Sequence, residues 1–129
     1  MKILLTGVAG FIGMHCAARL LERGDEVAGV DNLSPYYSVQ LKQDRLKRLE
    51  HPRFRFHAVD LVDAAALRAV FAGAAPDAVL HLAAQAGVRH SLEHPESYIQ
   101  SNLVGFANLL ECCRHQVPRH LVYASSSSV

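Results

Sequence analysis

The sequence predicts an α/β fold in which helices cover both faces of a parallel sheet. Five short apolar segments alternate with segments of helical spacing along the 129 residues. The first apolar segment leads directly into a turn that holds three glycines, and small or acidic residues follow the later ones. With 50% hydrophobic residues, a chain of this length is expected to form one domain with a real core.

The first strand is expected at residues 3–5, before the segment TGVAGFIG at 6–13. One glycine permits a tight turn, another lets the backbone approach a phosphate, and the third lets the next helix pack closely on the sheet. That helix runs to Gly24, a typical C-terminal glycine. The segment therefore predicts a dinucleotide pyrophosphate at the N-terminus of the helix.

The second strand, 26–30, ends at Asp31, 18 residues beyond Gly13. A carboxylate at about this spacing accepts hydrogen bonds from the adenosine ribose hydroxyls. It also repels a ribose 2′-phosphate, and no arginine occurs at 32–34, so NAD is expected rather than NADP. The alternative is that Asp31 is a solvated residue in a strand-to-loop turn.

The next helix is expected at 39–50, after a turn-rich loop at 32–37. Leucines 41, 46 and 49 lie on one side of it. Its basic residues are interspersed with acidic ones and are interpreted as a solvated face. These basic residues are Lys42, Arg45, Lys47 and Arg48.

The remaining elements continue the alternation of strands and helices. Strands are expected at 54–59, 78–83 and 121–124, and helices at 64–72 and 95–115. The expected buried positions of the last helix are Tyr98, Leu103, Phe106, Leu109 and Leu110. Right-handed crossovers favour the strand order 3-2-1-4-5, which is a Rossmann-like doubly wound sheet.

Ligands of such a sheet bind beyond the carboxyl ends of its strands. Asp60, which follows the third strand, could accept a hydrogen bond from the adenine amino group. Ala83 and Ala84, which end the fourth strand, would let a flat cofactor lie against the backbone. Arg89, just beyond them, is a candidate for a phosphate or substrate contact.

Composition excludes several classes of function. The net charge of +1 offers no basic field for nucleic acid, and no segment has the length or flanks of a membrane span or signal peptide. Three cysteines without CxxC spacing suit the reducing cytoplasm. His90 and His94 lack a third ligand at matching spacing, so no metal site is expected. His81 is expected to be a hydrogen-bonded core histidine.

Several motifs together resemble the extended short-chain dehydrogenase/reductase superfamily. They are the glycine segment 6–13, DNL at 31–33, DL at 60–61, HLAA at 81–84 and the serine run that ends before Val129. Within it, the strings AQAGVR at 84–89, SNLVGF at 101–106 and YASSSSV at 123–129 look like UDP-glucuronate 4-epimerases.

The resemblance implies an NAD site and a UDP-sugar substrate. The implied NAD contacts are Gly7, Gly10, Phe11, Ile12, Gly13, Asp31, Asn32, Asp60, Leu61, Leu82, Ala83, Ala84 and Ala124. Ser126 matches the catalytic hydroxyl that hydrogen-bonds the sugar, and Ser125 and Ser127 are candidates for the substrate carboxylate. The implied reaction oxidises sugar C4, rotates the keto sugar and returns the hydride to its opposite face.

The family also uses a Tyr-x-x-x-Lys pair, which this chain lacks. The residues four positions after its tyrosines are Gln40, Leu41, Asn102 and Ser127. We therefore expect 1–129 to be an incomplete NAD(P)-binding domain, truncated after strand five, without a substrate domain and inactive alone. The family commonly dimerises through helices of this domain. A dehydratase or decarboxylase of the same superfamily and a non-catalytic NAD-binding module are the alternatives.

Overall fold

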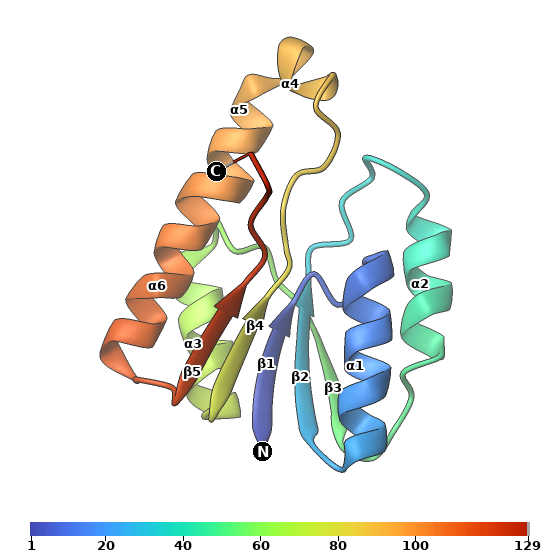
Figure 1. Cartoon of the computed structure of the whole chain (residues 1–129), viewed down its shortest axis with the longest axis vertical. Coiled ribbons are helices and arrows are strands. Elements are labelled where there is room, and N and C mark those ends of the chain that lie inside the picture. Colours follow the sequence, from blue (N-terminus) through green and yellow to red (C-terminus); the bar gives the residue numbers. More distant parts are fainter. Residues whose placement is uncertain (129) are drawn as a thin grey trace.

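A computed structural model describes residues 1–128 of the chain, and Val129 lies outside the described residues. Its five strands form one sheet in which every pair is parallel (Figure 1). The strands are β1 (Lys2–Thr6), β2 (Glu26–Asp31), β3 (Phe54–Ala58), β4 (Ala78–His81) and β5 (His120–Tyr123). The observed order, β3-β2-β1-β4-β5, confirms the predicted doubly wound sheet.

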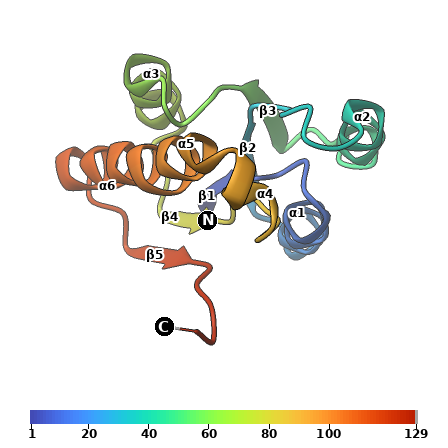
Figure 2. The same ribbon diagram turned by 90° about the horizontal axis from the view of Figure 1, so that it is seen from above.

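Helices cover both faces of the sheet, as Figure 2 shows from above. Helices α1 (Phe11–Arg23) and α2 (Val39–Lys47) lie on one face, and α3 (Ala64–Ala74) and α6 (Gly105–His115) lie on the other. The short helices α4 (His90–Glu93) and α5 (Pro95–Tyr98) and the π-helix η1 (Ile99–Val104) precede α6. None of the helices described in residues 1–128 combines the length and the hydropathy that a membrane span requires.

Strand β1 lies at the centre of the sheet and contributes to the core on both faces. Leu4 packs in the cluster that includes Phe71 and Leu109, while Leu5 packs in the cluster that includes Met14 and Leu21. Successive side chains of a strand point to opposite faces, so a strand covered on both faces is apolar throughout. Burial on both sides holds the end of β1, where the glycine turn begins, in place.

Helix α1 ends as predicted. Gly24 has φ +99°, and its N–H donates to the carbonyl oxygens of Leu20 and Leu21. This left-handed conformation costs a glycine little and would strain other residues.

The prediction of one regular helix at 95–115 is wrong. The chain forms a π-helix at Ile99–Val104, and Leu103 and Leu110, expected to be buried, are 65% and 43% exposed. Leu109 is fully buried. A π-turn closes an i→i+5 hydrogen bond, which shifts the following residues around the helix axis relative to a 3.6-residue projection.

The predicted solvated face of the second helix is also wrong in part. Lys42 is only 6% exposed, whereas Leu41 is 44% exposed. Leu49 is buried, but it lies beyond the end of α2. The Lys42 ammonium donates to the Ser34 carbonyl oxygen at 2.8 Å, so the loop after β2 covers the lysine. Contact between a loop and a helix cannot be read from helical periodicity.

Candidate functional site

A cleft of about 680 Å³ lies at the carboxyl ends of the strands, within the usual size range of small-molecule sites. Residues that follow all five strands line it. All the predicted cofactor residues are among them: Gly7, Gly10, Phe11, Ile12, Gly13, Asp31, Asn32, Asp60, Leu61, Leu82, Ala83, Ala84 and Ala124. The fold therefore brings this set together in one place.

The glycine turn leaves no space for a side chain at Gly7 or Gly13. Gly7 has φ +74°, and a Cβ atom on it would lie 2.8 Å from the Ala83 nitrogen. A Cβ on Gly13 would lie 1.9 Å from the Gly7 carbonyl oxygen. The first turn of α1 therefore packs directly on the backbone of the turn before it.

The N-terminus of α1 offers free N–H groups to the cleft. The Met14 N–H makes the first hydrogen bond of the helix, to the Gly10 oxygen at 3.0 Å, so the N–H groups of residues 11–13 precede the helical ladder. No acidic residue stands in the first turn, and Phe11 and Ile12 are 65% and 64% exposed. These donors and the positive end of the helix dipole fit a diphosphate.

Asp31 is buried, so its interpretation as a solvated turn residue is wrong. One carboxylate oxygen accepts from the Ala9 N–H at 3.0 Å, and the other accepts from the Leu33 N–H at 2.9 Å. The carboxylate thus links the glycine turn to the loop after β2. Each oxygen has a further lone pair with which to accept from a ligand hydroxyl.

The ends of β2 and β3 are joined by a side-chain hydrogen bond. The Asn32 amide donates to one Asp60 oxygen at 3.2 Å, and the Val62 N–H donates to the other at 3.1 Å. Asp60 is exposed at the cleft, and the neighbouring Leu61 is buried. This arrangement places an acceptor and an apolar surface side by side.

Thr6 organises the start of the loop after β4. Its Oγ1 accepts from the Leu82 and Ala83 N–H groups at 3.1 and 3.2 Å, and lies 2.7 Å from Nδ1 of His81. The hydroxyl hydrogen therefore points to Nδ1, so the histidine proton is on Nε2. The His81 ring stacks on Phe106 with centroids 5.0 Å apart. His81 is a hydrogen-bonded core histidine, as predicted.

Burial lowers the pKa of His81 from its ordinary value of 6.5. The unfolded state binds a proton more readily, so we expect stability to fall as the pH drops below about 6.5 towards the lower pKa of the folded state. Urea unfolding between about pH 5 and pH 8 measures this. In a His81→Asn variant, the free energy of unfolding should fall less between about pH 8 and about pH 5 than it does in the wild type. An unchanged slope would contradict the assignment to His81.

Four predicted residues lie outside the lining of the cleft. Arg89, Ser125, Ser126 and Ser127 are all exposed, and Ser126 Oγ accepts from the Ser128 N–H at 3.2 Å. Their catalytic and substrate roles stay predictions.

No metal site is found in the described part of the chain. The centroids of the His90 and His94 imidazole rings lie 4.7 Å apart. However, residues 1–128 hold no group of three or more His, Cys, Asp or Glu side chains that could bind a metal ion. A pair of histidines alone does not make a metal centre.

Sequence reasoning missed the part of the cleft made by loops and by the start of the last helix. The missed lining residues include Ser34, Tyr36, Tyr37, Lys42, Gln85, Ala86, Glu96, Ser97, Gln100 and Ser101. Reasoning from strand ends names only the first residues of each loop. The adjacent Tyr36 and Tyr37, in the turn-rich loop after Asp31, could have indicated this part of the cleft, because binding residues gather on loops.

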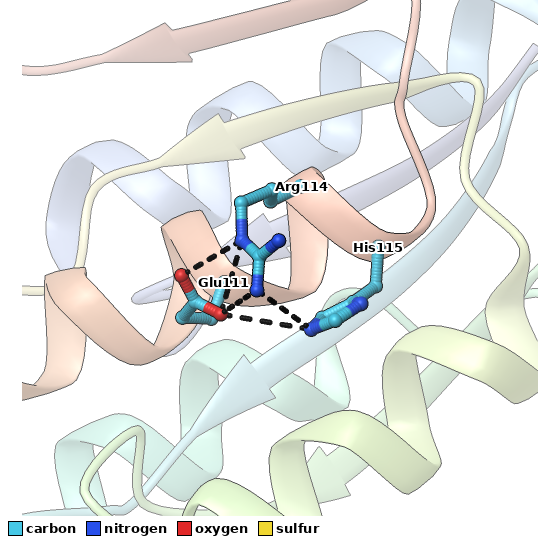
Figure 3. Close-up of polar contacts among 3 residues, drawn as sticks. All are labelled: Glu111, Arg114 and His115. Atoms are coloured by element: carbon cyan, nitrogen blue, oxygen red, sulfur yellow. Dashed lines mark hydrogen bonds and ion pairs between the residues drawn. The ribbon is translucent and has the colours of Figure 1, made fainter.

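Figure 3 shows a network of polar side chains on α6. None of the three lines the cleft. Arg114 donates to both carboxylate oxygens of Glu111, at distances of 2.9 to 3.3 Å, and His115 lies 3.6 Å from one of them. The Arg114 hydrogen bonds lower the pKa of Glu111. Exposed pairs of this kind add little stability.

Residues 4–129 match the family described as GDP-mannose 4,6 dehydratase. Protein CapI of Staphylococcus aureus is 54% identical over 129 residues, which are 100% of this chain and 39% of CapI. A probable UDP-glucuronate 4-epimerase of Rhizobium meliloti is 47% identical over 130 residues, with 100% and 38% covered. The chain thus spans about two fifths of the length of these relatives.

A solved structure has the same fold. It is a variant UDP-glucuronic acid 4-epimerase from Bacillus cereus, in complex with UDP-4-deoxy-4-fluoro-glucuronic acid and NAD. It is 34% identical with a TM-score of 0.85, and the match covers 100% of this chain and 41% of that one. The predicted family resemblance is confirmed: the chain belongs to the GDP-mannose 4,6 dehydratase family and is similar along its whole length to UDP-glucuronate 4-epimerases.

Proposed function

We propose that residues 1–129 form the NAD-binding domain of a nucleotide-sugar 4-epimerase. The observation that carries the proposal is the single cleft in which the glycine turn, the open N-terminus of α1 and the buried Asp31 meet. Related proteins support it, since the Bacillus cereus epimerase was solved with NAD.

The residues of the cleft fit the parts of NAD in turn. The N–H groups of residues 11–13 would hold the diphosphate, and Asp31 and Asn32 the adenosine ribose. The adenine would lie at Asp60 and Leu61. Small side chains at 83, 84 and 124 leave backbone open for the nicotinamide side. NAD, when bound, supplies the hydride acceptor and donor, while the protein supplies orientation.

For the whole enzyme we propose interconversion of UDP-glucuronate and UDP-galacturonate. The names of the Rhizobium meliloti and Bacillus cereus proteins support this substrate class. In this proposal Ser126 hydrogen-bonds the reacting sugar hydroxyl, Ser125 and Ser127 donate to the sugar carboxylate, and Arg89 contacts phosphate or substrate. A dehydratase is the second candidate, favoured by the description of the matching family.

We further propose a cytoplasmic homodimer. Three apolar side chains of the last helical run, Ile99, Leu103 and Leu110, are exposed and would suit a helix-to-helix contact with a second copy. The free thiols of Cys16, Cys112 and Cys113 suit a reducing compartment.

Titration of the chain with NAD and NADP, followed by an assay with UDP-glucuronate and NAD, tests the proposal. We expect NAD to bind and NADP to bind at least about tenfold more weakly, because Asp31 repels a 2′-phosphate. We expect no epimer above background, because the 129 residues contain no Tyr-x-x-x-Lys pair.

Each part of the proposal has its own contrary result. Failure to bind NAD would overturn the cofactor site, and equal affinity for both cofactors would show that Asp31 does not discriminate. Epimer formed by the 129 residues alone would overturn their predicted inactivity. Product analysis with a full-length enzyme separates the epimerase from the dehydratase.

A further inference from the structure

Lys42 is a buried cation in the cofactor cleft. Its side chain is 6% exposed and lines the cleft, and its ammonium lies 4.4 Å from the centre of the Tyr37 ring. Within residues 1–128, the ammonium makes one hydrogen bond, to the Ser34 carbonyl oxygen, and forms no ion pair. An ammonium has three N–H donors, and its burial without a counter-charge is unfavourable. An anion in the cleft would offset that cost.

Hydrogen bonds of the loop at residues 31–34 place this ammonium at the Asp31 end of the cleft. Asp31 accepts from the Leu33 N–H at 2.9 Å, and Asn32 Oδ1 accepts from the Ser34 N–H at 3.0 Å. The Ser34 oxygen in turn accepts from Lys42 at 2.8 Å. One short loop therefore connects two charged groups. They are the Asp31 carboxylate, proposed to bind the adenosine ribose, and the buried Lys42 ammonium.

The neighbouring cation, Arg45, makes two hydrogen bonds to the protein through one nitrogen of its guanidinium. Arg45 donates to the Ala9 carbonyl oxygen at 3.1 Å and to the Tyr37 hydroxyl at 2.8 Å. These bonds tie α2 to the glycine turn and do not require a ligand. Arg45 does not line the cleft, whereas Lys42 does.

We propose that Lys42 is a specificity-determining residue, which draws a phosphate on the adenosine ribose towards the cleft and so opposes Asp31. The inference rests on the proposed NAD site. The preference for NAD is then a balance of two charges at one loop: the carboxylate repels a 2′-phosphate and the ammonium attracts it. Loss of the ammonium leaves the repulsion unopposed, so the preference for NAD becomes stronger.

The test is a binding titration of NAD and NADP, without turnover, on the wild type, Lys42→Met and Lys47→Met. Methionine keeps most of the length of the side chain and removes its charge. We expect Lys42→Met to weaken NADP binding about tenfold more than NAD binding, which corresponds to one lost charge contact of about 1.4 kcal/mol. Lys47 is exposed on the same helix, so Lys47→Met should leave the ratio of the two affinities unchanged.

A purely structural role for Lys42 predicts a different result. If the lysine only holds the loop at Ser34, or contacts the diphosphate common to both cofactors, both affinities fall equally, and the proposal is overturned. Circular dichroism and thermal unfolding check that the variant is folded. If Lys42→Met is not folded, Lys42→Arg provides the second measurement, because arginine keeps the charge and binds phosphate through bidentate hydrogen bonds. It should bring NADP affinity closer to that of NAD, and an unchanged ratio would overturn the proposal.

The outcomes also separate this inference from the proposed function. A wild-type chain that binds neither cofactor refutes the NAD site itself. A wild type that binds NAD, together with a Lys42→Met variant of unchanged preference, refutes only the role of Lys42.

Discussion

Replacement of Gly13 with alanine is expected to destabilise the fold by about 3 kcal/mol or more and to weaken NAD binding at least about tenfold. The new Cβ would lie 1.9 Å from the Gly7 carbonyl oxygen and 2.8 Å from the Gly7 carbonyl carbon. Both are backbone atoms of the turn, so neither can rotate away. Helix α1 would have to move out of the turn and take its N–H groups with it.

Denaturant unfolding and an NAD titration of Gly13→Ala measure the two effects. The matched control is Gly73→Ala, because Gly73 lies inside α3 and a Cβ there meets nothing within 4 Å. That variant should be more stable by about 0.5 to 1 kcal/mol and bind NAD normally. A Gly13→Ala protein as stable as the wild type would show that the turn can expand.

Substitution of Thr6 by valine is expected to cost about 2 to 4 kcal/mol, since it removes an oxygen that pairs buried polar groups. Thr6 is fully buried. The Leu82 N–H also contacts the Thr6 backbone oxygen at 3.2 Å, so it keeps a partner. The Ala83 N–H and Nδ1 of His81 would lose theirs.

Thermal and urea unfolding of Thr6→Val and Thr6→Ser measure this effect. Serine keeps the oxygen and loses one methyl group, so it should cost only about 1 kcal/mol. Ala83 lies against Gly7, so the valine variant should also bind NAD more weakly. Equal stabilities of the valine and serine variants would show that the hydroxyl is unimportant.

The order of the strands and the position of the cleft could be predicted from the sequence because both depend on local patterns and one rule of handedness. Alternating strands and helices, joined by right-handed crossovers, lead to the observed order β3-β2-β1-β4-β5. The carboxyl ends of parallel strands meet at one edge of the sheet. Residues directly after the strands, such as Gly7, Asp31 and Asp60, therefore had to lie together.

The last helical run could not be predicted in detail. Periodicity assumed one regular helix from 95 to 115, but the π-helix at Ile99–Val104 changes which side chains face the sheet. Leu103, within the π-helix, and Leu110, in α6, are both exposed, although their spacing is that of core residues. Hydrogen bonds between loop and helix, such as that from the Gln85 N–H to Asn102 Oδ1 at 2.8 Å, are tertiary contacts with no local signature.

By itself, the sequence determined the fold class, the glycine turn and the acidic residue at the end of β2, because each follows from spacing along the chain. Only the tertiary structure decided that Lys42 is buried in the cleft and that the serines at 125–127 and Arg89 lie outside its lining. Spacing gives the direction of a side chain relative to its own helix or strand. Burial depends on what another segment places against it, and here that segment is the loop after β2.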